Sequence, residues 1–420
     1  MRSPIALIVS IVITGSAQGQ ELRAGAAKVD ITPPTGFPMW GYAVRRDQPS
    51  LKVMEPLLAR ALVLETGGTR IAFVALDMGR APTSKGRERI AAGLKKAGIG
   101  HFFVVASHTH HGPVLEVETW PDAKKPYVRE LEDKIVAVAL EAERGLKAAR
   151  LGVGRAEVPF NRNRHSKRAD APVDRELVVI RVDDAKTGEP MGHLVNFAAH
   201  ATMLPAKLRE FAPDFPGALC REVEAKGGVC LFLQGAAGDM SPNPAQGKTA
   251  EAFGKKLAER VLGLSREIKT EQTFAKGWQA KRREFKFGSR VDLGNPIIRA
   301  MYAYAFFPDL VSFYEREYRE GIRPEMTVAL LDERIGFVGV SGEFFSGHAL
   351  HLKKRARLEH LLFLGYCNDY HQYFPTIEAA AEGGYGADEL VSPVEVGAGE
   401  RMMDAALMEL YRMRGRKMTR

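Results

Sequence analysis

Short apolar runs alternate with helical patterns along most of the chain. TRIAFVALDM (69–78) and HFFVVASHTH (101–110) are continuous enough in apolar residues to predict buried strands. Between them, SKGRERIAAGLKKAG (84–98) has the apolar spacing of a helix, with a Ser at its start and a Gly at its end. The alternation continues to an amphipathic helix near 398–415. It predicts an α/β fold with a mixed, mostly parallel central sheet flanked by helices.

The remaining patterns follow the same rule. Further strands are predicted at ELVVIRVDD (176–184), HLVNFAAH (193–200), VCLFLQGAA (229–237), MTVALLDE (326–333), RIGFVGVSGE (334–343) and HLLFLGYCN (360–368), and further helices at 126–149, 215–228 and 250–268. The sequence contains neither an internal repeat nor a Pro/Ser-rich linker, so we expect one domain over 20–420. Residues 270–325 are expected to decorate its core.

The N-terminus has the pattern of a secretory signal. Arg2 is followed by an apolar run over 5–13 and then by the small residues of 15–19. The run is shorter than the roughly 20 residues that span a bilayer, and a buried core helix is the alternative. We therefore predict a signal peptide at 1–19 and a protein exported to the periplasm or the medium.

Charge and cysteine content narrow the partners only slightly. The formal net charge is +9, from 60 basic and 51 acidic residues. Such a surface permits peripheral contact with an anionic membrane, whereas the absence of an aromatic-interleaved basic motif argues against nucleic acid. No protein partner follows from the sequence.

The three cysteines leave two alternatives open. Either Cys220 and Cys230 form a bridge in an oxidising compartment, or all three, with Cys367, are buried thiols.

Polar side chains follow several of the predicted strands directly. Sites in open α/β sheets form at the carboxyl ends of strands, where the loops diverge. The strand FFVVAS runs into SHTHHGP, and in extended backbone His108 and His110 point to the same side. The other residues in such positions are His200, Asp239, Ser241, Glu343, Tyr366, Asn368, Tyr370 and Tyr373.

These residue types suit zinc at the strand carboxyl ends. A lone His at a strand end is more often a core residue than a ligand, but neutral imidazole is the commonest metal ligand. Catalytic zinc takes two or three His and a carboxylate and keeps one position open for water, and His108, His200 and Glu343 supply such a set. The GDMSPN segment is either a simple turn or a turn that presents Ser241; it lacks the GxSxG pattern of a serine triad.

Several motifs together carry a family resemblance. The chain resembles the catalytic N-terminal domain of the neutral/alkaline (non-lysosomal) ceramidases from about residue 23 to the tyrosines near 373–385. The matching segments, in the family's order, are AGAAKVDITPPTGFPMWGYA, EPLLARALVLETGG, SHTHHGP, PFNRN, VDRELVVIRVDD, NFAAHATML, DFPG, QGAAGDMSPN and SGEFFS.

The resemblance implies a zinc amidase that cleaves the N-acyl bond of ceramide to a sphingoid base and a fatty acid. Its implied zinc ligands are His108, His200, Glu343 and Tyr373, with Tyr370 as the alternative tyrosine. It further implies proton transfer or oxyanion binding by His110, a substrate-holding role for Arg162 and Tyr385, and a nucleophilic or orienting role for Ser241.

The departures from the family concern the substrate. The segments between His200 and Ser241 and between Ser241 and Glu343 are shortened, and His111 is an extra histidine. We expect the family's C-terminal immunoglobulin-like domain to be absent. The alternatives are a zinc deacylase or esterase for a smaller substrate, such as an N-acyl amino acid or an acylated sugar, and a non-catalytic lipid- or glycan-binding protein. Trp278 and the aromatic run 302–307 either line the substrate entrance or form an ordinary packed helix.

Overall fold

The computed structural model describes residues 19–416. The predicted signal peptide lies outside the described residues, apart from Gly19. Over the described part of the chain, no helix combines the length and the apolar character needed to cross a bilayer.

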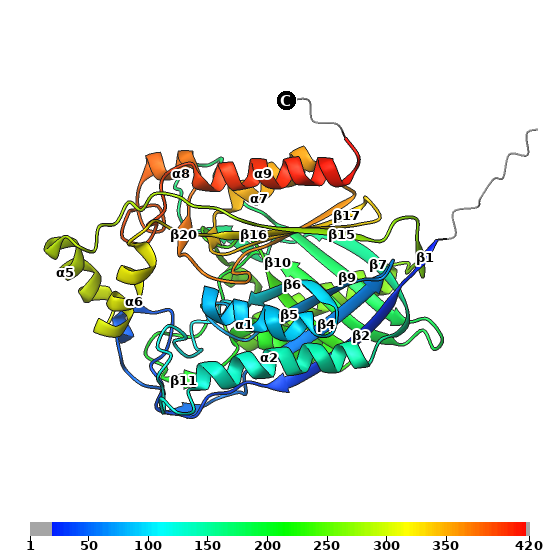
Figure 1. Ribbon diagram of the computed structural model, residues 1–420, viewed down its shortest axis with the longest axis horizontal. Helices are drawn as coiled ribbons and strands as arrows, with labels where there is room; N and C mark the ends of the chain where they lie inside the picture. The colour runs from blue at the N-terminus through cyan, green and yellow to red at the C-terminus, as the bar shows by residue number, and fades with distance from the viewer. Residues whose placement is uncertain (1–18, 417–420) are drawn as a thin grey trace, which may run out of the picture.

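Two sheets form the centre of the molecule (Figure 1). The eight-stranded sheet has the order β12 (Val229–Gln234), β10 (Pro190–Phe197), β9 (Glu176–Asp184), β7 (Lys147–Glu157), β2 (Arg23–Asp30), β4 (Leu58–Thr66), β5 (Thr69–Leu76), β6 (Ile99–Ala106). The four-stranded sheet has the order β15 (Trp278–Glu284), β16 (Glu325–Leu331), β17 (Ile335–Val340), β19 (His360–Leu364). Four two-stranded pairs join β1 (Gln20–Glu21) to β14 (Thr273–Phe274), β3 (Lys52–Val53) to β11 (Glu210–Phe211), β8 (Asn161–Asn163) to β13 (Met240–Pro242), and β18 (Glu343–Phe344) to β20 (Tyr373–Phe374).

The two sheets pack face to face across an apolar layer. Phe73 of β5 and Phe103 of β6 stack with their ring centroids 5.1 Å apart, and Phe337 of β17 closes on Phe73 at 4.9 Å. Neighbouring residues alternate, so that Phe73 faces this layer while Val74 faces the helices outside. Burial on both faces explains why these strands read as continuous apolar runs rather than as alternating patterns.

Helices cover the outer faces of both sheets, which gives four layers (Figure 1). The eight-stranded sheet is covered by α1 (Ser84–Lys95), α2 (Tyr127–Arg144), α3 (Asp214–Glu224) and α4 (Ala250–Glu267), and the four-stranded sheet by α7 (Ser346–Ala356) and α9 (Ala398–Met413). The remaining helical segments are η1 (Ala43–Arg45), η2 (Pro244–Gln246), α5 (Pro296–Ala305), α6 (Pro308–Tyr318) and α8 (Ile377–Glu382).

The predicted mostly parallel sheet is wrong. In the large sheet β5–β6 and β10–β12 are parallel, and the other neighbouring strands are antiparallel. The two parallel pairs are the ones whose strands are joined by the predicted helices α1 and α3. The other connections include tight turns, such as Gly67-Gly68 between β4 and β5, where φ values of 61° and 73° suit glycine.

Residues 270–325 divide between core and periphery. β15 is an edge strand of the four-stranded sheet, and Trp278 is buried between the two sheets, so it does not line a substrate entrance. Helices α5 and α6 form a pair at one end of the molecule (Figure 1). The three cysteines are buried free thiols.

Candidate metal centre

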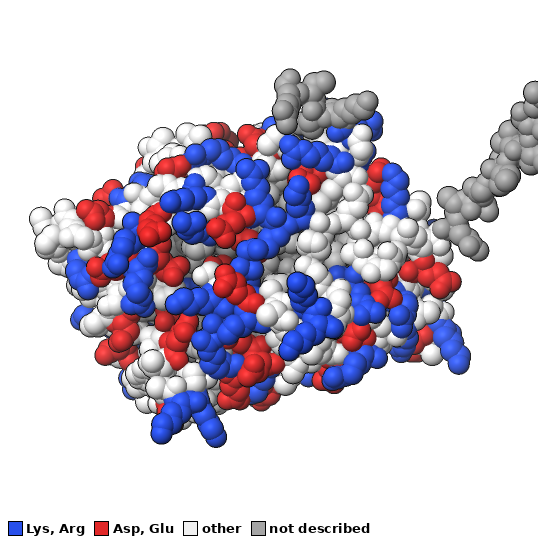
Figure 2. Space-filling model, viewed as in Figure 1, with Lys and Arg blue, Asp and Glu red and all other residues white. Residues whose placement is uncertain are grey.

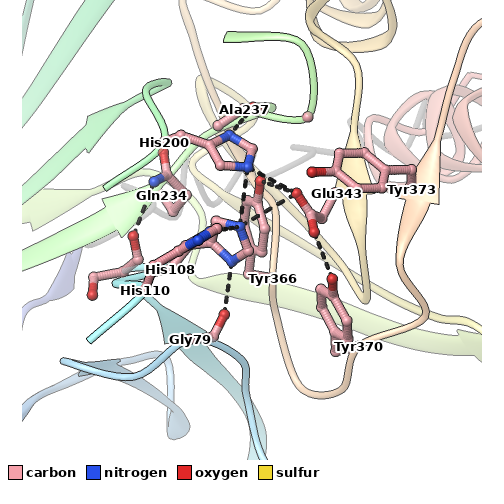
Figure 3. Close-up of polar contacts among 12 residues, drawn as sticks. Gly79, His108, His110, His200, Gln234, Ala237, Glu343, Tyr366, Tyr370 and Tyr373 are labelled. Atoms are coloured by element: carbon pink, nitrogen blue, oxygen red, sulfur yellow. Dashed lines mark hydrogen bonds and ion pairs between the residues drawn. The ribbon is translucent and has the colours of Figure 1, made fainter. Parts of the chain in front are cut away.

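Three side chains from distant parts of the chain meet beyond the strand ends (Figure 3). His108 follows β6, His200 follows β10, and Glu343 opens β18 just after β17. The Nε2 atoms of the two histidines are 3.1 Å apart, and Glu343 Oε2 lies 3.3 Å from His108 Nε2 and 3.1 Å from His200 Nε2. All three side chains are buried. The two sheets therefore deliver an imidazole pair and a carboxylate to one point.

Backbone carbonyl groups fix the orientation of both imidazoles. His108 Nδ1 lies 2.7 Å from the Gly79 carbonyl oxygen, and His200 Nδ1 lies 2.6 Å from that of Ala237. Because a carbonyl oxygen only accepts, each Nδ1 carries the proton and donates it. Each Nε2 consequently directs a lone pair at its counterpart and at Glu343, as metal-binding histidines do.

His108 reaches this position through an unusual backbone. β6 ends at Ala106, and His108 has a left-handed φ of 65°, with its N–H donating to Met78 O at 2.9 Å. The expectation that His108 and His110 share one side of an extended strand is therefore wrong in its geometry. Their Nε2 atoms are nevertheless 3.3 Å apart, and the ligand atoms of His108, His110 and His200 lie within 4.8 Å of one another.

The charge state of the cluster suits a cation. Burial lowers the pKa of His200 to about 3 and that of His110 well below its usual value, so both imidazoles are neutral near pH 7. The cluster thus combines neutral imidazole nitrogens with a carboxylate.

The spacing of these donors fits zinc. Four ligands at 2.0–2.1 Å in a tetrahedron have neighbouring atoms about 3.3 Å apart. The separations of 3.1 and 3.3 Å between the three donor atoms agree with that value. The types of donor atom, their protonation and their spacing are all compatible with a bound zinc ion.

The tyrosines around Glu343 make different contacts. Tyr366 donates to Glu343 Oε2 at 3.2 Å, and Tyr370 donates to Oε1 at 2.5 Å. Tyr373 instead lies on the His200 side, with its ring stacked at 6.5 Å and its hydroxyl accepting from Arg164 Nη2 at 3.0 Å. The Tyr370 hydroxyl is thus engaged with the carboxylate, while β18 and β20 bring Tyr373 directly beside Glu343 in register.

Arg164 is the site residue that the sequence analysis missed. Its Nη2 lies 2.8 Å from His200 Nε2 and donates to the Gly238 carbonyl at 3.0 Å. Arg162, the predicted residue, is exposed on β8 and is not among the side chains that meet here. The sequence signal was the second arginine of the NRNR segment, two residues beyond the position that the family pattern indicates.

The other two predicted residues lie around the cluster. Ser241 is paired with Arg162 between β13 and β8, and its Oγ is buried without a hydrogen-bond partner among the described residues. The preceding Met240 carbonyl accepts from the His200 N–H at 3.1 Å, which ties this segment to the site. Tyr385 is exposed, with its ring 5.7 Å from that of Tyr373.

An apolar cavity of about 170 Å³ opens onto the cluster. Glu343 and His110 stand in its wall, together with Tyr373 and Tyr385. Its apolar and aromatic lining includes Trp40, Tyr42, Phe306, Phe307, Leu310 and Tyr314. The end of the 302–307 aromatic run therefore lines this cavity, whereas Tyr302 is buried and Tyr304 is exposed.

Comparison with known proteins places the chain in a family. Residues 22–280 match the family model described as neutral/alkaline non-lysosomal ceramidase, N-terminal. The neutral ceramidase of Pseudomonas aeruginosa is 28% identical over 268 residues, which are 56% of this chain and 39% of that protein. This chain therefore aligns with well under half of the relative's length.

Solved structures extend the likeness of fold. A crystal structure of the neutral ceramidase from Pseudomonas aeruginosa has a TM-score of 0.78 at 19% identity and covers 96% of this chain and 76% of its own. A structure described as ceramidase complexed with C2 gives the same TM-score and coverage at 18% identity. With the family's N-terminal domain matched over most of the chain and the fold over nearly all of it, the protein belongs to the neutral/alkaline non-lysosomal ceramidase family.

Proposed function

We propose that this protein is a zinc-dependent amidohydrolase that cleaves the N-acyl amide bond of ceramide or a ceramide-like lipid to a sphingoid base and a fatty acid. The observation that carries the proposal is the convergence of His108, His200 and Glu343 within 3.3 Å beside an apolar cavity. In this proposal these residues hold zinc, with Tyr373 as the fourth protein ligand. Family membership supplies the reaction class.

The reaction assigns separate tasks to the ion and the chain. When bound, zinc would polarise the acyl carbonyl and activate a water for attack. Arg164 holds a guanidinium beside His200, where it stabilises the oxygen that becomes negative. Arg164 thereby takes the role that the sequence assigned to Arg162. Tyr385, in the cavity wall, positions the acylated group. Ser241 takes the orienting role rather than the nucleophilic one.

His110 is the proposed proton carrier. It stands in the cavity wall, and its Nδ1 is buried without a partner among the described residues. The edges of Trp40 and Tyr42 hold its ring at centroid distances of 5.5 and 4.7 Å. An amide nitrogen leaves only as it is protonated, and a neutral imidazole fixed beside the reacting carbonyl can relay that proton from the attacking water.

Displacing His110 should separate proton transfer from metal binding. A Cβ at Gly41 would lie 2.5 Å from His110 Cγ, so Gly41→Ala must move the ring. We expect kcat/KM to fall about 100-fold, the lower range for general acid–base catalysis, with zinc content unchanged. Gly36→Ala is the matched control, because Gly36 has a similar φ of 94° but nothing within 4 Å of its added Cβ. Loss of zinc in Gly41→Ala, or an equal fall in Gly36→Ala, would contradict this role.

A smaller acylated substrate is the second candidate. The cavity volume of about 170 Å³ is below the roughly 300–1,000 Å³ of ordinary ligand pockets. This favours a short acyl group, as in an N-acyl amino acid or an acylated sugar, on the same centre. A catalytically silent lipid- or glycan-binding protein would bind no zinc.

One panel distinguishes these functions. Purified protein is assayed on long-chain ceramide, short-chain ceramide, an N-acyl amino acid and a simple acetyl ester, with and without a zinc chelator. We expect chelator-sensitive release whose kcat/KM rises about fourfold for each additional buried CH₂, from about 0.8 kcal/mol per group. Release only from the short or polar substrates would replace ceramide by the second candidate. Chelator-resistant release would overturn the zinc mechanism.

Export is part of the same proposal. The apolar run at 5–13 and the small residues after it support cleavage near residue 19. N-terminal sequencing of the protein recovered outside the cytoplasm should begin near residue 20, whereas an intact Met1 would contradict export.

A further inference from the structure

Helix α5 exposes an apolar face at the end of the molecule. Ile297, Met301 and Tyr304 are 72%, 47% and 85% exposed, and their i, i+4, i+7 spacing places them on one side of the helix. Tyr302 is buried. The helix contains a single charged residue, Arg299, which is paired with Glu315 of α6. Figure 2 shows a cluster of uncharged atoms at the tip of this end, bordered by charged side chains.

A second segment adds to this surface. Val44, in η1, is 76% exposed, and Arg46 donates from Nη2 to the Ala303 carbonyl of α5 at 3.3 Å. We name Val44, Ile297, Met301 and Tyr304 the apolar rim. Isolated exposed apolar residues are ordinary on protein surfaces, but here two segments about 250 residues apart in sequence contribute to one place.

The apolar rim adjoins the entrance of the catalytic cavity. Ala43 and Arg46, on either side of Val44 and Arg45, line that cavity. Phe306 and Phe307, which follow α5 directly, line it as well. The cavity continues from these residues to Glu343 and His110. The rim therefore lies next in sequence to residues that line the cavity of the candidate metal centre.

We propose that the apolar rim inserts into the surface of a lipid bilayer, so that an acylated lipid passes from the membrane into the cavity without crossing water. A face of a helix that carries apolar residues and an interfacial tyrosine suits the boundary between headgroups and acyl chains. A lipid fits better than a protein partner, because a protein seated on the rim would cover the entrance. Arg299 of α5 is already paired with Glu315, and the exposed Arg46 beside Val44 donates to the Ala303 carbonyl. We therefore expect apolar insertion, rather than attraction to anionic lipid, to dominate binding. This inference rests on the proposed function for its substrate, but docking itself is measured without catalysis.

The test is flotation with phosphatidylcholine vesicles. We expect the mature protein to float with them, and the double variant Ile297→Ser/Tyr304→Ser to partition at least about tenfold more weakly, because both substitutions remove apolar surface that the bilayer would bury. Tyr304→Trp should retain binding. The matched control is Ile377→Ser on α8, at a residue that is 50% exposed and lies outside the rim. The double variant should hydrolyse a soluble short-chain substrate at the wild-type rate.

Each remaining outcome is decisive. The proposal is overturned if the wild type does not float, if the double variant floats equally well, or if Ile377→Ser loses as much binding. It is also overturned if binding needs phosphatidylglycerol vesicles and ignores the rim, since the net charge of +9 would then account for it. Protein that floats but hydrolyses no acylated substrate would contradict the proposed function and leave docking intact. Hydrolysis of the acylated substrate without flotation would contradict docking and leave the proposed function intact.

Discussion

His108→Ala should abolish both zinc binding and hydrolysis. His108 Nε2 stands within 3.3 Å of the His200 imidazole and of the Glu343 carboxylate, so its removal takes away one of three convergent donors. Loss of an outer-shell partner alone typically costs about 10–100-fold in metal affinity or activity, and loss of a ligand should exceed the upper end of that range. Zinc content measured by mass spectrometry and kcat/KM should therefore fall together.

The same strand supplies the control. His101 lies on β6, is only partly buried, and is not among the residues of the cluster. His101→Ala should keep one zinc per chain and nearly full activity. Added zinc should restore a chelated wild-type protein but not His108→Ala. If His108→Ala retained stoichiometric zinc and wild-type turnover, the proposed zinc centre would be wrong.

The candidate metal ligands could be predicted because the end of an apolar run in the sequence marks where a buried strand ends. His200 and Glu343 follow apolar runs whose ends are clear from composition, and the structure brings them together. Arg164 and the contacts of the tyrosines depend instead on tertiary pairing. β18 and β20 bring Glu343 beside Tyr373 through a two-residue pairing with no sequence signal of its own.

The prediction that neighbouring strands are mostly parallel was wrong for a related reason. Buried strands of parallel and antiparallel sheets both read as continuous apolar runs when each face is covered. The helices α1 and α3 were predicted correctly, and they do connect parallel strands. The antiparallel strands β2, β4 and β7 were not identified as strands from the sequence, and they account for much of the sheet. Strands that the apolar pattern does not mark thus decided the topology.

Arg80→Met should be strongly destabilising, although Arg80 lies outside the set of candidate metal ligands. The Arg80 guanidinium donates to Glu116 Oε1 at 3.0 Å and to Asp369 Oδ1 at 2.9 Å, and all three side chains are buried. Removing the cation leaves two buried carboxylates without their partner. Breaking a buried pair in this way costs about 3–5 kcal/mol, and urea unfolding of zinc-saturated protein measures it as a lower free energy of unfolding.

An exposed ion pair gives the comparison. Arg334 contacts Glu271 at 3.2 Å with both side chains well exposed, so Arg334→Met should cost less than about 1 kcal/mol. The double variant Arg80→Met/Glu116→Gln should recover part of the loss, because one of the two stranded charges is then absent. A deficit for Arg80→Met as small as that of Arg334→Met would show that the buried network contributes little.

The Arg80 network also bears on the site itself. The Arg80 guanidinium lies 5.3 Å from the centroid of the Tyr370 ring, and Tyr370 donates to Glu343. Tyr314 of α6 donates to Glu116 at 3.2 Å, which connects the cavity lining to the same cation. Arg80→Met should therefore lower kcat/KM even without urea and at a temperature where the variant is fully folded. Arg334→Met should leave kcat/KM unchanged under the same conditions. An unchanged kcat/KM in folded Arg80→Met would show that the Arg80 network contributes to the free energy of unfolding but not to catalysis.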